Sequence, residues 1–507
     1  MSKNDEDLEA KLLATDGELP SSPATKATAA GNTYALVCAL LASLASIIYG
    51  YNRGVMSGAQ KYVQADLDVS DGQLEVLIGL TSVYSLVGSL AAGWACDRAG
   101  RRRTVALSAA MFLAGSVVTA AANGYAGLMA GQLLAGVASG FGLVVAPVYI
   151  AEIAPAASRG FLSSIPEIAG NSGILLSYIA DFALAGLPTT LNWRLMIGIG
   201  AVPPLFLAAS ALLVMPETPR WLVLHGHPDE ARRVLARTAG DDPATADRRL
   251  QEIVASSKQQ AGPKASSTSV WREILLRPTP AVRRVMLAIL GLQFFQQACG
   301  VAAMVLYAPR VFGHVGITSE HAVLGATVLL GVVKVVFIVI PLFLSDRMGR
   351  RPMLLSSAAG MAVSLLVLGL SMHTAPAATS SATATWWAAV TCVVAAAAFM
   401  ATFSLGFGPV IWMYGSEILP LRLRAQGTGV GTAVNRVMSA VVGMTFISVY
   451  EAVGMAGSFY IFAAFSGLAW VFVYACLPET KGKSLEEMEA LFDGSAGGRK
   501  RQLPSLS

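Results

Sequence analysis

Three glutamine side chains lie close together inside one long apolar segment of the chain. Gln293, Gln296 and Gln297 are spaced so that they fall on one side of a helix. An amide that faces lipid without a hydrogen-bond partner is costly, so these side chains must face protein or a wet cavity. Gly300 follows, where a helix can break or bend. The pattern is typical of a cavity for a polyhydroxylated solute; amides that only join neighbouring helices are the alternative.

The composition indicates that this segment belongs to a membrane protein. The chain has 507 residues, of which 54% are hydrophobic and 13% are charged. A soluble protein carries about a quarter charged residues, and a membrane-spanning helix needs about 20 apolar ones. The apolar stretches accommodate about a dozen such helices, so we expect an all-α membrane protein with twelve transmembrane helices. The net charge of +5 reflects arginine-rich loops rather than a nucleic-acid-binding face.

The expected spans divide into two sets of six. They lie near residues 34–55, 75–95, 104–122, 125–150, 161–186 and 193–214, and then near 283–312, 321–345, 352–372, 385–414, 425–449 and 457–477. We therefore expect a disordered cytoplasmic tail (1–32), an N-terminal six-helix bundle (33–215), a cytoplasmic helical linker region (216–280), a C-terminal six-helix bundle (281–478) and a cytoplasmic tail (479–507). Charge spacing in the linker region predicts short surface helices at 229–238 and 245–256.

Charged motifs recur in the same order in both halves of the chain. Asp97-Arg98-Ala-Gly100-Arg101-Arg102 returns as Asp346-Arg347-Met-Gly349-Arg350-Arg351, Glu152…Arg159 returns as Glu417…Arg424, and Pro216-Glu217-Thr218 returns as Pro478-Glu479-Thr480. Three motifs that repeat in register indicate two matching bundles with a binding site between them. The arginine-rich loops mark the cytoplasmic side, which places both termini there.

The arginines satisfy the positive-inside rule, but that rule does not explain the aspartates of the same loops. We expect the motif residues to form salt bridges between the halves that hold one face shut. These gating residues are Asp97, Arg98, Arg101, Glu152, Arg159, Glu217, Asp346, Arg347, Arg350, Glu417, Arg424 and Glu479.

The duplicated D-R-x-G-R-R loops resemble those of the major facilitator superfamily. The segments that resemble its sugar porter branch are Pro216-Glu217-Thr-Pro219-Arg220, Gln296-Gln297-x-x-Gly300 and Gly406-Phe-Gly-Pro409-Val-Ile-Trp412. The segments Ala146–Glu152, Ile165–Glu167 and Val305–Arg310 most closely resemble plant polyol/monosaccharide transporters. The resemblance covers about residues 35–485 and implies alternating access with a sugar or polyol bound at the midplane.

The resemblance also implies roles for individual residues. Gln296, Gln297 and Asn435 would hydrogen-bond sugar hydroxyls, and Trp412 would lie against the C–H face of the ring. Glu167 matches a position that is Gln in glucose facilitators and Glu in polyol transporters. Packing is the alternative for Trp412 and helix–helix bonding the alternative for Asn435. Glu167 is ionisable and lies within a span, where a functional role is the default reading.

The sequence departs from the family where proton coupling usually occurs. Proton-coupled relatives carry an Asp and an Arg at the positions that read Asn52 and Gln132 here. Neither amide titrates, and the two can bond each other, so we expect facilitated transport. Symport with Glu167 as the proton site is the alternative. Arg53, beside Asn52, is expected to snorkel outward.

Other functions fit the sequence less well. A non-transporting sugar sensor would need a signalling module, and the C-terminal tail is short. The spans contain no His cluster, metal-ligand spacing or nucleophile motif, so we expect no enzyme, catalytic residue, metal or cofactor. Lys334, mid-span, would neutralise a partner that the sequence does not identify. The expected partners are a small sugar or polyol and the lipid bilayer, with the protein monomeric in the plasma membrane.

Overall fold

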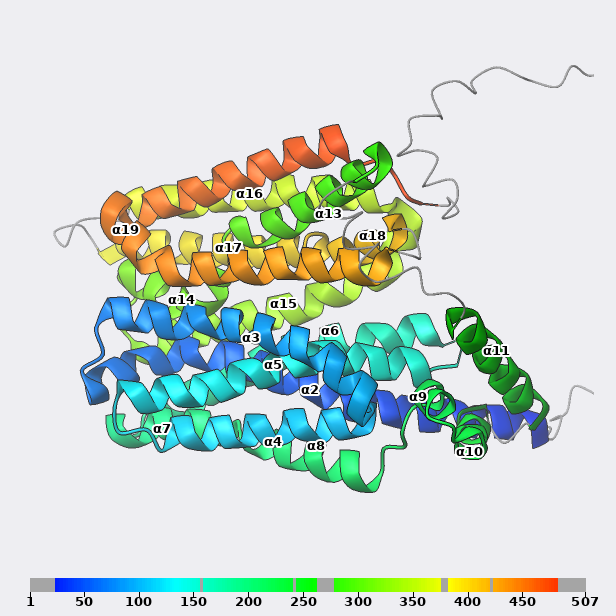
Figure 1. Ribbon diagram of the computed structural model, residues 1–507. Coiled ribbons are helices and arrows are strands. Elements are labelled where there is room, and N and C mark those ends of the chain that lie inside the picture. Colours follow the sequence, from blue (N-terminus) through cyan, green and yellow to red (C-terminus); the bar gives the residue numbers. More distant parts are fainter. Residues whose placement is uncertain are drawn as a thin grey trace, which may run out of the picture.

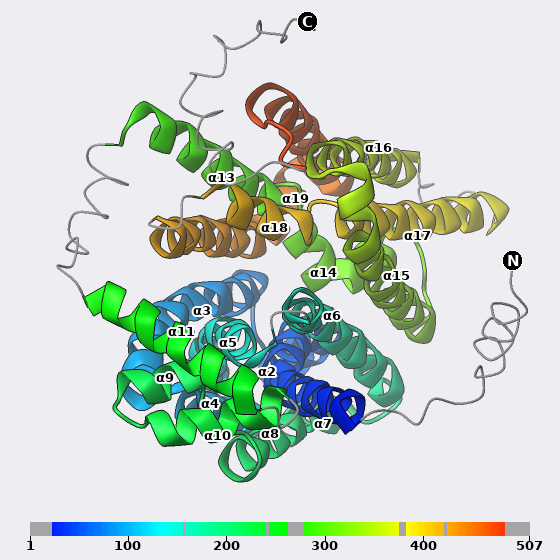
Figure 2. The same cartoon turned by 90° about the vertical axis from the view of Figure 1, so that its right-hand side faces the viewer.

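The computed structural model describes residues 23–155, 158–239, 243–261, 278–374, 382–419 and 423–481. Within these ranges the chain is built of helices, which divide into two groups that lie side by side (Figures 1 and 2). The first group comprises α2 (Pro23–Leu67), α3 (Asp71–Ala99), α4 (Arg101–Ala120), α5 (Tyr125–Ile153), α6 (Arg159–Leu184), α7 (Thr189–Ile199) and α8 (Val202–Leu213). The second comprises α13 (Pro280–Ala298), α14 (Val301–His314), α15 (Glu320–Met348), α16 (Arg350–Thr374), α17 (Ala382–Leu405), α18 (Val410–Ile418) and α19 (Arg424–Cys476).

The helices provide the expected twelve membrane passes. Ten stretches of the described residues are long and apolar enough to cross a bilayer. One of them, Gln426–Cys476, has 51 residues and turns back at Gly454, which supplies two passes (Figure 1). α6 adds a 26-residue helix to this set. The prediction of an all-α, twelve-helix protein in two halves is confirmed.

Several boundaries differ from the predicted spans. α2 begins at Pro23, inside the segment that the sequence analysis assigned to the disordered tail, and it continues to Leu67. The sixth span consists of two helices, α7 and α8, with Gly200 and Ala201 between them. The linker region contains α9 (Pro219–Leu224), α10 (Pro228–Ala239) and α11 (Pro243–Ala261), of which α10 and α11 match the two predicted surface helices. An Arg232–Asp247 ion pair joins these two.

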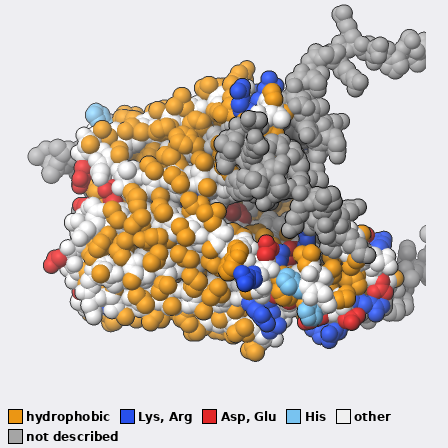
Figure 3. All heavy atoms as spheres, in the orientation of Figure 1, with side chains coloured by type: hydrophobic (Ala, Val, Ile, Leu, Met, Phe, Trp, Pro, Cys, Tyr) orange, Lys and Arg blue, Asp and Glu red, His pale blue; other side chains and the backbone are white. Residues whose placement is uncertain are grey.

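Helices α9, α10 and α11 lie at one end of the molecule, which we call the linker end (Figure 1). The far end is the opposite one, where α2 ends and α3 begins. A capping box starts α3: the Ser70 hydroxyl accepts from the backbone N–H of Gln73, whose side chain accepts from the N–H of Ser70. Apolar side chains cover the flank between the two ends, and charged side chains gather near both ends (Figure 3). This distribution suits a protein whose flank faces lipid.

Glycines bring α2 into close contact with α6. Gly50, Gly54 and Gly58 recur every four residues on α2, and a Cβ at Gly50 would lie 1.9 Å from the carbonyl oxygen of Gly170 on α6. Small residues at this spacing allow two helix backbones to approach closely within a membrane. The approach fixes the position of the next residues on α2, which include Asn52 and Arg53.

Candidate functional site

Gln296 is fully engaged in hydrogen bonds within the second half. Its Nε2 donates to the carbonyl oxygens of Phe407 (2.6 Å) and Gly408 (3.0 Å), in the break between α17 and α18. Its Oε1 accepts from Nδ2 of Asn435 at 2.6 Å. Gln296 therefore ties α13 to the broken span and to α19, and the alternative of helix–helix bonding describes this side chain well.

Two other amides of the cluster retain free hydrogen-bonding capacity. Gln297 donates from Nε2 to Oδ1 of Asn435 at 3.3 Å, but its Oε1 is buried without a hydrogen-bond partner. Oε1 of Gln293 is also buried without a partner. An unsatisfied buried acceptor costs about 1–3 kcal/mol, and a solute hydroxyl would satisfy it. The structure brings the four amides together; their contact with a solute stays a prediction.

Gly300 breaks the helix directly after the cluster, as the sequence predicts. It has φ +87°, in the left-handed region, and separates α13 from α14. A Cβ at this position would also lie 2.6 Å from the ring of Phe462. Glycine is therefore required here for both its backbone conformation and its lack of a side chain.

The other two predicted substrate residues, Trp412 and Glu167, lie on helices α18 and α6. Trp412 is half-buried on α18, the helix that follows the break to which Gln296 is bonded; its contact with a solute stays a prediction. Glu167 lies on α6 in the first half, with a solvent-accessible side chain that accepts from Asn171 at 3.4 Å. Lys334 on α15 lies within electrostatic range of Glu167 and of Arg53.

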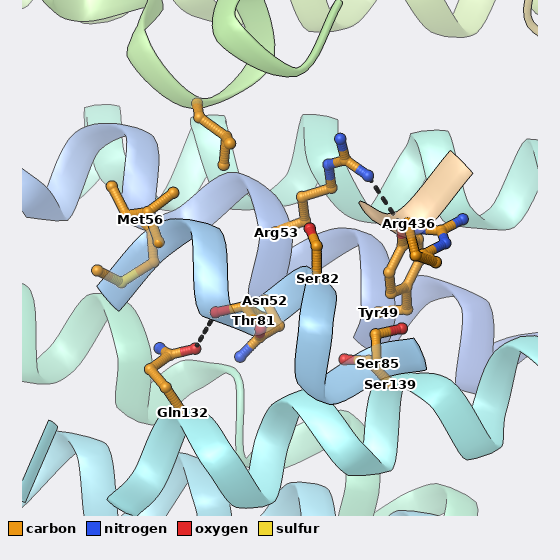
Figure 4. Close-up of a pocket in the computed structure, with 12 residues that line it drawn as sticks. Tyr49, Asn52, Arg53, Met56, Thr81, Ser82, Ser85, Gln132, Ser139 and Arg436 are labelled. Carbon is orange, nitrogen blue, oxygen red and sulfur yellow. Dashed lines mark hydrogen bonds between the residues drawn. The ribbon is translucent and has the colours of Figure 1, made fainter. Parts of the chain in front are cut away.

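Asn52 and Gln132 line one pocket between the halves, together with Tyr49, Arg53 and Arg436 (Figure 4). The two amides could bond each other, but among the described residues Gln132 has another partner. Oε1 of Gln132 instead accepts from the Thr81 hydroxyl at 3.2 Å, because Thr81 on α3 faces α5 at this level.

Arg53 points into this pocket rather than outward, so the prediction of snorkelling is wrong. It donates to the hydroxyl of Tyr49 at 2.9 Å and to the hydroxyl of Ser439, in the other half, at 3.3 Å. Arg436 donates to the same Tyr49 hydroxyl at 2.7 Å (Figure 4). The sequence analysis missed Tyr49 and Arg436. Arg436 could have been found by the criterion applied to Glu167, since an ionisable residue within a span has a functional role by default.

At the far end, α14 is held by the first half. The carbonyl oxygens of Val305 and Leu306 accept from Tyr178 (2.7 Å) and Gln60 (3.3 Å). Arg310 donates to Asp71 at 2.6 Å. α14 follows the break at Gly300, so a helix next to the amide cluster is bonded across the interface.

A buried carboxylate joins α3 to α19 at the same end. Glu75 is 3% exposed and accepts from the backbone N–H of Ile447 (2.5 Å) and of Ser448 (3.0 Å), and from the Ser448 hydroxyl (2.6 Å). Glu320 adds a bridge to Lys61 at 3.3 Å. The sequence analysis overlooked these residues because they lie outside the repeated motifs.

The predicted gating salt bridges form, but within each half rather than between the halves. Arg101 pairs with Glu152 at 3.0 Å, and Arg350 pairs with Glu417 at 2.9 Å. Asp97 lies 3.7 Å from Arg101. The prediction of inter-half latches is therefore wrong for this conformation, because each arginine begins a helix of the same bundle as its carboxylate.

Other members of the predicted gating set have local roles. The guanidinium of Arg98 lies over the ring of Trp94 at 5.3 Å, and the carbonyl oxygen of Arg347 accepts from Lys481. The side chains of Arg159, Asp346 and Arg424 lie outside the described part of the structure.

The two Pro-Glu-Thr motifs cap equivalent helices. Glu217 accepts from the backbone N–H of Arg101 at 2.9 Å, and Glu479 accepts from the backbone N–H of Arg350 at 3.0 Å. Each carboxylate thus binds free N–H groups at the start of α4 or α16, where a negative charge is favourable. Burial raises the pKa of the Glu217 carboxyl, and the backbone donors oppose that rise.

Comparisons with known proteins agree with this architecture. The sequence profile of the family described as "Sugar (and other) transporter" matches residues 38–492. The chain is 46% identical to Polyol transporter 5 of Arabidopsis thaliana, over 94% of this chain and 88% of that protein. The chain belongs to the sugar porter family of the major facilitator superfamily. The resemblance predicted from the motifs is confirmed, and this sugar porter is a transmembrane transporter rather than an enzyme.

More distant relatives and solved structures match over almost the same length. The Glucose transporter GlcP of Staphylococcus epidermidis is 31% identical to this sugar porter, over 91% of this chain and 98% of that protein. The inward-open xylose transporter XylE of E. coli matches with a TM-score of 0.74 and 26% identity, over 90% of this chain and 99% of that one. The proton:xylose symporter XylE bound to 6-bromo-6-deoxy-D-glucose matches with a TM-score of 0.72 and 27% identity, over 91% of this chain and 99% of that one.

Proposed function

We propose that this sugar porter carries a monosaccharide or a linear polyol across the membrane by alternating access. The observation that carries the proposal is the pair of buried, unpartnered amide oxygens on Gln293 and Gln297, beside the helix break at Gly300. These oxygens suit the hydroxyl donors of a polyhydroxylated solute. The names of the relatives, a polyol transporter and a glucose transporter, support the same substrate class.

We assign the linker end to the cytoplasm and the described conformation to an inward-facing state. Hydrogen bonds that join the halves extend from Arg436 in the middle of the molecule to Glu75 and Arg310 near the far end. Closure at the far end supports a chamber that opens toward the linker end. The arginine-rich loops lie at the linker end, which the positive-inside rule places in the cytoplasm. Both termini are then cytoplasmic, and we place the protein in the plasma membrane as a monomer.

Transport is facilitated rather than proton-coupled. Asn52 and Gln132 occupy the positions of the usual coupling pair, and neither exchanges a proton. One observation favours symport as the second candidate: Glu167 interacts electrostatically with Lys334 of the opposite half. A carboxylate whose cationic partner moves with the other bundle would change its proton affinity between the two states.

Uptake into proteoliposomes of the full chain tests both proposals. Radiolabelled D-sorbitol and D-glucose should enter protein-containing liposomes faster than protein-free ones. If neither label enters faster, the proposed transport is contradicted. The outside pH of an unbuffered suspension should stay constant during uptake, because no proton accompanies the solute.

External alkalinisation that accompanies uptake would overturn facilitated transport. Loss of that signal in Glu167→Gln would then assign the proton to Glu167. Glu451→Gln is the matched control, because Glu451 is an exposed carboxylate outside the chamber.

A further inference from the structure

The pocket between the halves, which Tyr49, Asn52, Arg53, Gln132 and Arg436 line and which we call the chamber, carries an excess of positive charge. Arg53 and Arg436 line the pocket, and its lining residues include no Asp or Glu. Lys334 interacts electrostatically with Arg53 and with Glu167, and Glu167 interacts with Arg436. These interacting groups comprise three cations and one carboxylate, so their formal charge is +2. A neutral polyol or sugar does not require such an excess.

The cations are also short of hydrogen-bond acceptors. Arg436 and Lys334 are each 7% exposed, and Nε of Arg436 is buried without a partner. Arg53 and Arg436 both donate to one oxygen, that of the Tyr49 side chain. An arginine offers five N–H donors, and a buried charge without a counter-charge is costly.

Nearby buried carboxylates do not supply the missing negative charge. Asp181 lies beside Gly58, five residues after Arg53 on α2 and about 7 Å along the helix axis, and it does not line the pocket. Its Oδ2 accepts from the backbone N–H of Gly58. Glu75 is engaged by the backbone of Ile447 and Ser448 at the far end. Glu75 is therefore committed elsewhere; Asp181 keeps Oδ1 without a partner but does not line the pocket.

We infer that the chamber accepts a polyhydroxylated carboxylate, an aldonate or a uronate, whose anionic group binds Arg436 and Arg53 with Lys334 nearby. Arginine recognises a carboxylate through paired N–H donors, and such charge-assisted bonds are about twice as strong as neutral ones. The same pocket presents neutral partners for the hydroxyls of the solute, including Asn52, Ser82 and Gln132. The inference rests on the proposed sugar or polyol transport and narrows its substrate class.

The test compares solutes that differ only at one terminal group. Full-length protein in proteoliposomes takes up radiolabelled D-sorbitol in the presence of increasing unlabelled D-gluconate or D-sorbitol. D-glucuronate and D-glucose form a second pair. We expect each acid to reach half-inhibition at a concentration about tenfold lower than its neutral counterpart, the effect of one charge-assisted bond. Labelled D-gluconate should itself enter protein-containing liposomes.

Arg436→Gln retains a hydrogen-bonding group and removes the charge. It should raise the half-inhibitory concentration of gluconate about tenfold and change that of sorbitol much less. Arg53→Gln is a second variant if Arg436→Gln does not yield folded protein. Arg283→Gln is the control, because it removes an equal charge from an exposed site at the start of α13.

Equal competition by acid and neutral solutes would overturn the inference. The inference would also be overturned if the arginine variants raised the half-inhibitory concentrations of gluconate and of sorbitol by the same factor. In either case sorbitol uptake by the unmodified protein would leave the proposed function intact. Absence of uptake of every labelled solute would instead refute the proposed function, so the two failures are distinguishable.

Discussion

Arg436 and Tyr49 join the two halves of this sugar porter through a hydrogen bond of 2.7 Å, in the middle of the molecule. Tyr49 also accepts from Arg53 of its own half, so one hydroxyl serves two guanidinium groups. The phenol therefore both links the halves and holds two like charges in place.

Removal of this hydroxyl should loosen the interface. Tyr49→Phe leaves both arginines without their shared acceptor, and hydrogen bonds to charged groups contribute about 1.5–3 kcal/mol. We expect a lower thermal unfolding temperature in detergent than for the unmodified protein. Tyr474→Phe is the control, because the Tyr474 side chain is exposed. Equal unfolding temperatures for Tyr49→Phe and the control would contradict the role assigned to Tyr49.

Substitutions of the two neighbouring glutamines should have different effects. Gln297→Ala removes an unpartnered oxygen and one bond of 3.3 Å, so we expect a weaker apparent affinity for sorbitol with little change in thermal stability. Gln296→Ala strands the carbonyl oxygens of Phe407 and Gly408 and should destabilise the fold by about 2–4 kcal/mol. Transport kinetics and thermal unfolding of both variants provide the measurement. A stability loss of the same size in both would refute the distinction.

Glu75→Gln should shift the equilibrium toward a state that is open at the far end. The amide keeps the shape of the side chain but removes the charge that three donors now share. Loss of charge-assisted bonding changes the equilibrium about tenfold or more. Distances between two spin labels, one near the start of α3 and one near the turn of α19 at Gly454, would report the opening.

Glu320→Gln is the matched control for this experiment. It alters a bridge to Lys61, whose side chain is 75% exposed, and a bond of 2.5 Å from the Tyr62 hydroxyl, which a glutamine oxygen can still accept. We therefore expect a smaller opening than for Glu75→Gln, which affects three donors. An opening of similar size in both variants would show that Glu75 has no special role in closure.

Gly100→Ala should destabilise the cap at the start of α4. Gly100 has φ +91° and ψ 163°, a conformation adopted almost only by glycine, and an added Cβ would lie 2.3 Å from the Glu217 carboxylate. We expect a loss of about 1–3 kcal/mol from the backbone alone. Gly93→Ala, in a helix with open space around it, should be neutral or slightly stabilising. Thermal unfolding of both variants checks the prediction, and equal stability would contradict it.

The sequence predicted the elements that depend on local pattern. Apolar length predicted the spans, and the break at Gly300 followed from the position of a glycine after a polar stretch. The repeated motifs predicted which charges would pair. Arg101 pairs with Glu152 in the first half, and Arg350 pairs with Glu417 at the equivalent positions of the second half.

The sequence did not predict which element each side chain faces. Tyr49 precedes Arg53 by one helical turn, but nothing in α2 alone shows that Ser439 of the other half lies beside Arg53. The motif salt bridges were expected between the halves because charge complementarity is the same whether the partner lies in one bundle or the other. Only the packing of α3 against α19 brings Glu75 to the backbone of Ile447. Such contacts join residues hundreds of positions apart and leave no periodic signal.

The capping carboxylates Glu217 and Glu479 have one further consequence. Each closes its own bundle by binding the first turn of a helix in that bundle, next to an arginine that is paired there as well. At the linker end, each bundle is therefore bonded internally, through a cap and an ion pair that do not involve the other bundle. The bonds that join the halves, such as those of Arg436, Glu75 and Arg310, are therefore separate from those that hold each bundle together.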